Sequence, residues 1–452
     1  MHCLGMALAA LATLTFPVGC ERDFSNVPAP ADLLFTADTV SFDTIFAGFP
    51  TPTLRVALRN VGDEDVTVSS IALEGGESSA FMVNINGVSG ARAENVRLCH
   101  GDSLLVFVSV RDASVSGGRA FRSLADRIVA SNGAYEWDSK VVATVRNVKA
   151  MAGLIEKDEQ WLCDSIPYLI TDSVAVAEAA TLLVGPGVSV ILDDDAFLDV
   201  LGRLVVAGDV RNRSSFASAR QDGIYSAVPG QWFGVLIEAG GVADIRYCDV
   251  ACASYALACD SMSTLTAEGL WIRDASRSGV YLYKADAEIS NTIISDCGGG
   301  SFNITGGRTR LRHVTAADYY SWDYRKVAAL RFDSSTDPTA SLDVANSIII
   351  GNLSAEVVPD SLHAGVATVR SSLIRGDKKT IEAATDVFID CVVATDAHFA
   401  DRDNADYHVT SKSDAAGLAD ETLAPDLPTD FEGALRETGQ PWTAGALQTV
   451  AE

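Results

Sequence analysis

The chain has 452 residues, 48% of them hydrophobic, so it is long enough for two or three domains with buried cores. Its 60 Asp and Glu against 34 Lys and Arg give a formal net charge of −26. A surface this acidic repels phosphate backbones, which excludes nucleic acid as an expected partner. No stretch after residue 20 is apolar for the roughly 18 residues that a membrane-spanning helix needs.

An apolar run at residues 4–19 ends in Pro17-Val18-Gly19, directly before Cys20. Its length is typical of the hydrophobic part of a secretory signal peptide. The residues around Cys20 resemble the lipobox of bacterial lipoproteins, although Pro17 stands where that motif usually has Leu. The resemblance implies that residues 1–19 are a lipoprotein signal peptide and that Cys20 becomes an acylated N-terminus; an ordinary cleaved signal peptide is the alternative.

Residues 20–32 contain a short charged stretch and two prolines, which is typical of a tether. Residues 33–148 then show short alternating runs separated by Gly, Asn, Asp and Ser. In one run Leu54, Val56 and Leu58 point to one side of a strand and the residues between them to the other. Such runs predict an antiparallel, immunoglobulin-like β-sandwich, which we expect to act as a spacer or as a cap on the region that follows.

A 22-residue repeat organises the second part of the chain. Residues 149–165 are more polar and are interpreted as a linker, and residues 166–375 contain short strand-like pieces. Four apolar residues in this region are each 22 positions apart (267−245, 289−267, 311−289): Ile245, Ala267, Ile289 and Leu311. A β-rich unit of this length, too short for a pair of helices, predicts the stacked coils of a solenoid, and the strand-like pieces are typical of a parallel β-helix. Residues 376–452 are rich in Asp and Pro and are interpreted as C-terminal coils and a cap.

Several stretches carry a resemblance to a known family. They are SFDTIF at residues 41–46, residues 161–168, PGQW at residues 229–232, and FEGALR with GALQ within residues 431–448. On these residues the chain resembles envelope lipoproteins of Gram-negative bacteria that join an immunoglobulin-like domain to a pectin lyase-like, right-handed parallel β-helix. The resemblance covers nearly the whole mature chain. It implies an all-β fold and attachment to the outer membrane or cell surface through a lipid anchor, and it transfers no catalytic residue.

A fourth column follows the same repeat: Cys252 and the three acidic residues Asp274, Asp296 and Asp318 are again 22 positions apart. Successive coils lie about 4.8 Å apart, so stacked carboxylates repel one another unless a cation, a proton or hydrogen bonds relieve the charge. We favour a ladder of turn residues that bond to backbone groups of neighbouring coils. The alternative is a Ca²⁺ site, or the catalytic site of a polysaccharide lyase or glycoside hydrolase.

An aromatic stretch interrupts the repeat at residues 319–326, where the sequence is YYSWDYRK. Tyr319, Tyr320, Trp322 and Tyr324 lie in an insertion between two coils, and we predict that they form a platform for sugar rings. The alternative is that the rings fold down and cover apolar surface of the solenoid.

The sequence therefore predicts a lipid-anchored envelope protein that binds or adheres to glycans at the cell surface. A polysaccharide lyase or glycoside hydrolase and a purely structural envelope protein remain alternatives. No cofactor is expected apart from a possible Ca²⁺, and the oligomeric state is left open. Seven cysteines follow Cys20, an odd number that excludes complete disulfide pairing. The closest of them, Cys248, Cys252 and Cys259, are predicted to be small buried residues.

Overall fold

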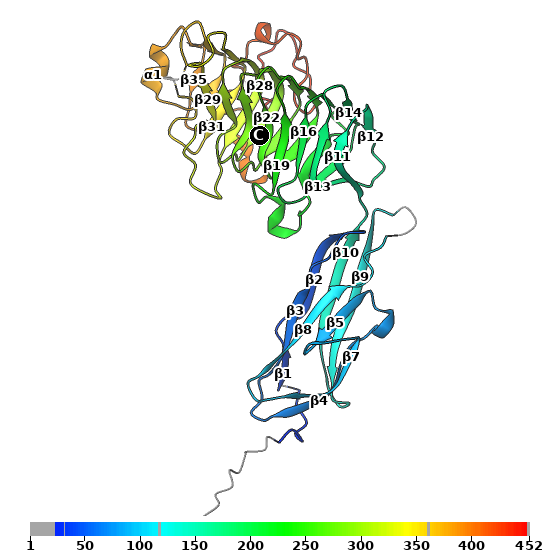
Figure 1. Cartoon of the computed structure of the whole chain (residues 1–452). Coiled ribbons are helices and arrows are strands. Elements are labelled where there is room, and N and C mark those ends of the chain that lie inside the picture. The colour runs from blue at the N-terminus through cyan, green and yellow to red at the C-terminus, as the bar shows by residue number, and fades with distance from the viewer. Residues whose placement is uncertain (1–22, 31, 116–118, 359–361, 450–452) are drawn as a thin grey trace, which may run out of the picture. The chain divides into compact units, whose positions relative to one another are not determined.

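The computed structural model (Figure 1) describes residues 23–30, 32–115, 119–358 and 362–449. Residues 1–19, predicted above to be a signal peptide, and Cys20 lie outside the described residues. The chain divides into two compact units, with the boundary between Arg146 and Asn147. In the part of the chain that is described, no helix has the length and apolar character needed to cross a membrane.

The first unit is a sandwich of two five-stranded sheets. The first sheet has the order β1 (Leu33–Phe35), β3 (Leu54–Asn60), β8 (Ser103–Val110), β5 (Phe81–Ile85) and β6 (Val88–Ser89). The second has the order β2 (Thr39–Phe46), β10 (Glu136–Arg146), β9 (Phe121–Ser131), β4 (Val66–Leu73) and β7 (Arg92–Leu98). A short 3₁₀ helix, Gly76–Ser78, follows β4. All pairings are antiparallel except β2 with β10, which is parallel. The predicted immunoglobulin-like sandwich is confirmed.

The alternation seen in the sequence builds the core of this sandwich. One side chain of every two points inward from each strand, so Leu58, Val68, Phe81 and Ile128 are fully buried between the sheets. The residues between them form the two outer faces of the sandwich, and only one of these faces carries carboxylates.

The second unit is a right-handed parallel β-helix in which 25 strands, β11 to β35, form one continuous sheet that winds around a core. The first side of the solenoid contains β12 (Glu159–Trp161), β14 (Thr181–Val184), β17 (Arg203–Ala207), β20 (Val242–Arg246), β23 (Thr264–Glu268), the first halves of β26 (Asp286–Ser295) and β28 (Arg308–Asp318), β30 (Ser341–Ala345), β32 (Ala367–Arg370) and β34 (Phe388–Ile389).

The second side contains β15 (Ser189–Leu192), β18 (Ser214–Ser218), β21 (Cys248–Ala251), β24 (Trp271–Arg273), the second halves of β26 and β28, β31 (Ile348–Gly351), β33 (Leu373–Ile374) and β35 (Val392–Val393). The third side contains β16 (Phe197–Val200), β19 (Trp232–Ile237), β22 (Ala253–Cys259), β25 (Ser278–Tyr283), β27 (Phe302–Thr305) and β29 (Leu330–Asp333). Strands β11 (Lys149–Ile155) and β13 (Tyr168–Val176) bend and contribute to the second and third sides. The strand labels in Figure 1 follow the same order along the solenoid.

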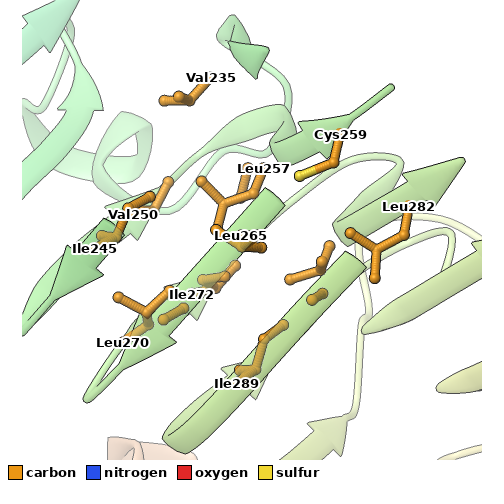
Figure 2. Close-up of a cluster of buried hydrophobic side chains, with 14 of the residues drawn as sticks. Val235, Ile245, Val250, Leu257, Cys259, Leu265, Leu270, Ile272, Leu282 and Ile289 are labelled. Atoms are coloured by element: carbon orange, nitrogen blue, oxygen red, sulfur yellow. The ribbon is translucent and has the colours of Figure 1, made fainter. Parts of the chain in front are cut away.

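Residues 22 positions apart in the sequence pair with each other on neighbouring coils. Ile245 pairs with Ala267, Ala267 with Ile289, and Ile289 with Leu311. Figure 2 shows side chains from all three sides meeting in the core, among them Leu257 from the third side, Ile272 from the second and Leu265 from the first. The apolar columns of the sequence are therefore stacks of buried side chains, and the solenoid prediction is confirmed.

The solenoid begins at Lys149 rather than at residue 166. Residues 149–165, interpreted above as a linker, supply β11 and β12, which pair with β13 and β14. Only a few side chains of these two strands are buried, among them Ile155 and Trp161. The polar residues between them face outward, which is why the segment has so little hydrophobic signal.

Residues 394–449, here called the C-terminal strap, fold back over the second side of the solenoid. They follow helix α1 (Lys378–Ala383) and include β36 (Phe399–Asp401), β37 (Asp406–Val409) and the short 3₁₀ helices Arg402–Asn404 and Glu421–Leu423. Another 3₁₀ helix, Gly223–Ser226, lies in the loop before β19. In the strap Tyr407, Phe431 and Leu447 pack against Ile293 and Ala317.

Hydrogen bonds fix the strap at the corner between the first and second sides. Asn291 Nδ2 donates to the Thr429 carbonyl (3.0 Å), and Asn346 Nδ2 donates to the Asp420 carbonyl (2.9 Å). The corner residues have positive φ, 45° at Asn291 and 54° at Asn346, which points their amides away from the core toward the strap. The strap therefore closes the outer face of the second side.

Candidate functional site

The four aromatic residues of the insertion do not form one platform. Tyr320 is buried against Gly298, and the half-buried ring of Tyr319 lies 4.5 Å from the Arg402 guanidinium of the strap. Trp322 and Tyr324 are 50% and 80% exposed. The structure thus separates the rings into a packed pair and a solvent-exposed pair.

The insertion is held from inside by a buried ionic network. The Arg325 guanidinium makes two hydrogen bonds to the carboxylate of Glu356, one of them 2.8 Å, and donates to the backbone carbonyl of Asp318 at 2.9 Å. All three side chains are at most 1% exposed. Glu356 also accepts from the backbone N–H of Ala329 at 2.9 Å. The basic residue that follows the aromatic stretch therefore shapes the loop and does not reach solvent.

Asp318 is enclosed within the solenoid. Its two oxygens accept from the backbone N–H groups of Cys297 and Ser301, both at 2.8 Å, and from Ser301 Oγ at 2.9 Å. Burial raises the pKa of Asp318 to about 7, while the guanidinium of Arg325, 3.7 Å away, acts in the opposite direction. Both oxygens of this carboxyl group are used within the fold.

Asp274 and Asp296 share a corner between the second and third sides. Both have positive φ, 55° and 54°, whereas Asp318 continues strand β28. Asp274 lies 3.4 Å from Arg273 Nη1, and Asp296 accepts from the Tyr407 hydroxyl of the strap at 3.4 Å. Burial raises the pKa of Asp274 to about 6 and that of Asp296 above its ordinary value. The structure brings two of the three column residues together and turns the third inward.

No group of three or more His, Cys, Asp or Glu that could hold a metal ion occurs in the described ranges. Cys248, Cys252 and Cys259 are buried and unpaired. Burial raises the pKa of each of these thiols, to about 11 for Cys252 and about 12 for Cys259. This confirms that the three cysteines are small core residues.

An aromatic ladder that was not anticipated crosses the third side of the solenoid. Phe197, Phe233, Tyr255 and Tyr281 lie on the outer face of four successive strands, β16, β19, β22 and β25. Neighbouring ring centroids are 6.3, 6.0 and 5.7 Å apart, and the rings are inclined by 67°, 55° and 65°. These separations and angles are typical of edge-to-face contacts. We call the outer face of β16, β19, β22 and β25 the aromatic face.

The backbone of β19 explains how the ladder is spaced. Gly234 pairs with Phe197 on one neighbouring strand and with Tyr255 on the other. A Cβ atom at Gly234 would lie 2.1 Å from the Tyr255 carbonyl oxygen, so only glycine fits here. The ring of the preceding residue, Phe233, occupies the space between the two and is 39% exposed.

Polar groups border the rings. Asp199 follows Phe197 on the same face, and Glu238, directly after the end of β19, lies diagonally opposite it because Asp199 pairs with Leu236. Burial raises the pKa of both carboxyl groups, and the Asp199 charge raises that of Glu238 further. Asp199 Oδ1 is buried without a hydrogen-bond partner among the described residues. Arg277 Nη1 donates to the Tyr255 hydroxyl at 3.4 Å.

The first side presents a different outer surface, here called the ion-pair face. Its acidic and basic side chains pair with each other from coil to coil: Asp286 with Arg308, Glu288 with Arg310, and Asp343 with both Arg312 and Arg370. The separation is 3.4 Å for Glu288 with Arg310 and 2.7 Å for Asp343 with Arg370. These charges are satisfied by one another, and no aromatic ring lies among them.

Part of the ladder follows the repeat and was visible in the sequence. Phe233 and Tyr255 are one 22-residue step apart (255−233), and Arg277 is one further step (277−255). The step to Phe197 is 36 residues (233−197), because the loop before β19 intervenes. The step to Tyr281 is 26 residues (281−255). A column search at constant spacing therefore finds only two of the four rings.

No family model and no curated protein matches this chain. A structural search relates part of it to the periplasmic chaperone SfaE, with 11% identity and a TM-score of 0.18 over 25% of this chain and 57% of the chaperone. It also relates part of it to the VesB protease of Vibrio cholerae, with 11% identity and a TM-score of 0.17 over 25% of this chain and 32% of the protease. At these TM-scores neither similarity supports an argument about fold or function.

Proposed function

We propose that this chain is a lipid-anchored cell-envelope protein that binds glycans along the aromatic face of its β-helix. The observation that carries the proposal is the ladder of four partly exposed rings on the outer face of the third side. Sugars offer apolar C–H faces to aromatic rings and hydroxyl groups to polar side chains. The aromatic face supplies both.

The polar border of the ladder supports a ligand rich in hydroxyl groups. Asp199 shares a side-chain hydrogen bond with Glu238 beside the rings, and burial raises the pKa of its carboxyl group. Glu238 beside it has a raised pKa, so one proton can be shared by the two carboxyl groups. Sugar hydroxyls can donate to either. With carboxyl groups at its border and a net charge of −26 on the chain, this face suits a neutral polysaccharide better than an anionic one.

Attachment to the outer membrane or cell surface is proposed from the sequence around Cys20. The apolar run, the small residues before the cysteine and the tether of residues 20–32 support acylation of Cys20. The measurement is the mass of the N-terminal peptide of the protein purified from membranes. A diacylated or triacylated Cys20 peptide is expected, and an unmodified peptide beginning near residue 20 would show an ordinary signal peptide instead.

The binding proposal is tested with soluble protein starting at Ser25. Affinity electrophoresis in gels that contain neutral or acidic polysaccharides measures retardation of the wild type and of three variants. Phe233→Ala and Tyr255→Ala are each expected to weaken binding on the order of tenfold, because a stacked ring contributes about 1–1.5 kcal/mol. Trp322→Ala in the insertion and Arg310→Ala on the ion-pair face serve as controls with exposed side chains.

Each outcome of this experiment distinguishes one alternative. If only Trp322→Ala loses binding, the exposed rings of the insertion are the site, as the sequence first indicated. New reducing ends or unsaturated products that disappear in Asp296→Asn would identify a hydrolase or lyase. An absence of retardation with every polysaccharide contradicts glycan binding and leaves a structural envelope role.

A further inference from the structure

The first sheet of the sandwich is free of acidic residues. Its five strands, β1, β3, β8, β5 and β6, contain no Asp or Glu and include Arg55 and Arg59, both exposed on β3. The strands of the second sheet contain five carboxylates: Asp43, Glu94, Asp126, Glu136 and Asp138. The second sheet also carries six basic residues, so the two sheets differ in the presence of carboxylates and not in net charge.

The same sheet exposes large apolar side chains on its outer face and at its edge. They are Leu34 (55% exposed), Met82 (42%), Val88 (67%), Leu105 (42%) and Phe107 (37%). Phe107 on β8 pairs with Arg55 on one side and with Asn84 on the other, so the three residues are cross-strand neighbours on the same face. A cavity of about 430 Å³ opens beside Phe107 and Met82 and also includes Arg111. We call Arg55, Arg59 and these apolar residues the arginine–apolar face.

The two arginines of this face form no ion pair with any described carboxylate. Arginines of the second sheet do: Arg127 binds Glu74 at 2.8 Å, and Arg92 binds Glu94 at 3.0 Å. An unpaired guanidinium beside exposed apolar surface is complementary to a partner that has both negative charge and an apolar layer.

The charge of the sandwich as a whole permits such a partner. Residues 33–146 contain 13 Asp and Glu and 10 Lys and Arg, a net charge of −3. Residues 147–452 contain 44 Asp and Glu and 23 Lys and Arg, a net charge of −21. Most of the negative charge thus belongs to the solenoid. Its repulsion is screened beyond about 10 Å at 0.1 M salt.

We propose that the arginine–apolar face docks on an anionic phospholipid surface. Guanidinium groups bind lipid phosphates with paired hydrogen bonds, and Phe107, Leu105 and Met82 enter the interfacial layer. This deepens the proposed function and rests on the anchor at Cys20. Leu33, the first residue of β1, is 13 residues after Cys20 (33−20) and belongs to this sheet. Thirteen extended residues span at most about 45 Å, which keeps the sheet within reach of the bilayer.

The test uses the two-domain chain from residue 21 onward, which carries no acyl group. Its sedimentation is measured at low ionic strength with vesicles of phosphatidylcholine alone and of phosphatidylcholine mixed equally with phosphatidylglycerol. The wild type is expected to bind only the anionic vesicles and to be released by salt. The double variant Arg55→Glu/Arg59→Glu is expected to lose binding on the order of tenfold or more. Phe107→Ser, which leaves the charge unchanged, is expected to weaken it as well.

The matched control is Arg92→Glu/Arg97→Glu, which makes the same charge change on β7 in the second sheet. It is expected to keep its vesicle binding, and equal thermal unfolding of all variants shows that each is folded. The proposal is overturned if the wild type ignores anionic vesicles, or if the control loses binding equally. It is also overturned if light scattering without vesicles shows dimers that Arg55→Glu/Arg59→Glu dissolves, because the face would then bind a second, acidic copy of the chain.

The vesicle experiment can fail without either the anchor or the glycan-binding proposal failing. Because the protein is not acylated, vesicle binding measures the face alone, whereas the mass of the Cys20 peptide measures the anchor. A failure of the vesicle experiment with an acylated Cys20 therefore removes only the docking face. Glycan binding is measured on the other unit and is unaffected.

Discussion

Two outer faces of the same solenoid carry apolar side chains, and the chain treats them in opposite ways. On the second side the strap lays Tyr407, Phe431 and Leu447 over Ile293 and Ala317. On the third side the rings of the aromatic face remain half-exposed. The strap thus buries one apolar face of the solenoid, while the rings of the other face are partly exposed. An apolar face that stays open beside one that is closed indicates a binding surface.

The second-side face and the aromatic face also differ in the kind of side chain that they present. The closed face presents mostly aliphatic side chains, which gain free energy only by leaving water. The open face presents aromatic rings with polar borders, which can bind a ligand that also needs hydrogen bonds. The predictions below separate these two roles, from the largest effect to the smallest.

The largest effect is expected at the insertion that connects the closed face to the open one. Arg325→Met leaves the carboxylates of Asp318 and Glu356 buried without their partner, so we expect the free energy of unfolding to fall by about 3–5 kcal/mol. Urea denaturation measures this. Arg310→Met removes an ion pair on the ion-pair face, where both side chains are more than half exposed, and should change stability by less than about 1 kcal/mol. Similar losses in both variants would contradict the structural role of the buried network.

Breaking the closed face should cost stability without affecting binding. Phe431 is 8% exposed, and its ring also lies 4.4 Å from the Arg213 guanidinium. Phe431→Ala is expected to lower the free energy of unfolding by about 3 kcal/mol and to leave glycan retardation unchanged. Phe233→Ala on the open face, where the ring is 39% exposed, should lower it by about 1 kcal/mol or less. If both variants lose equal stability, the aromatic face is packed in solution and is not a free surface.

The corner between these faces should show a pH dependence. Burial raises the pKa of Asp274 to about 6 from its ordinary value of 3.8. The folded state therefore holds the proton more tightly than the unfolded state, and stability falls as the pH rises from about 4 to about 6. Asp274→Asn removes this dependence, so the variant should match the wild type near pH 4 and exceed it by about 2 kcal/mol at pH 7. Unfolding curves across this range test it, and a constant difference would contradict the raised pKa.

The comparison of faces also shows what the sequence can reveal. The solenoid was predictable because burial demands an apolar residue at the same place in every coil, so Ile245, Ala267 and Ile289 recur at one spacing. Residues on the outer faces need not be apolar at every coil, and loops of any length can be inserted between coils. Such a loop lengthens the step from Phe197 to Phe233, so the aromatic ladder does not follow the 22-residue spacing and was not predicted.

The candidate site residues show the same limit. Tyr319, Tyr320, Trp322 and Tyr324 are adjacent in sequence, but the turn of the loop directs only the last two to solvent. Asp318 keeps the register of Asp274 and Asp296 but lacks their positive φ, and so its side chain points inward. The repeat predicts which residues are equivalent along the chain. The local backbone conformation decides which way they point.

The smallest effect on glycan binding is expected at the edge of the aromatic face. It is also the most specific test of the proposed binding site. The Arg277 guanidinium lies 5.6 Å from the Tyr255 ring centroid and donates to its hydroxyl at 3.4 Å. It orients the ring, and the exposed contact contributes about 0.5–1 kcal/mol, so Arg277→Ala should weaken glycan retardation only two- to fivefold. In the background of Tyr255→Ala the same change should have almost no effect, because the ring it positions is gone. Full additivity of the two losses would show that Arg277 contacts the glycan independently of the ladder.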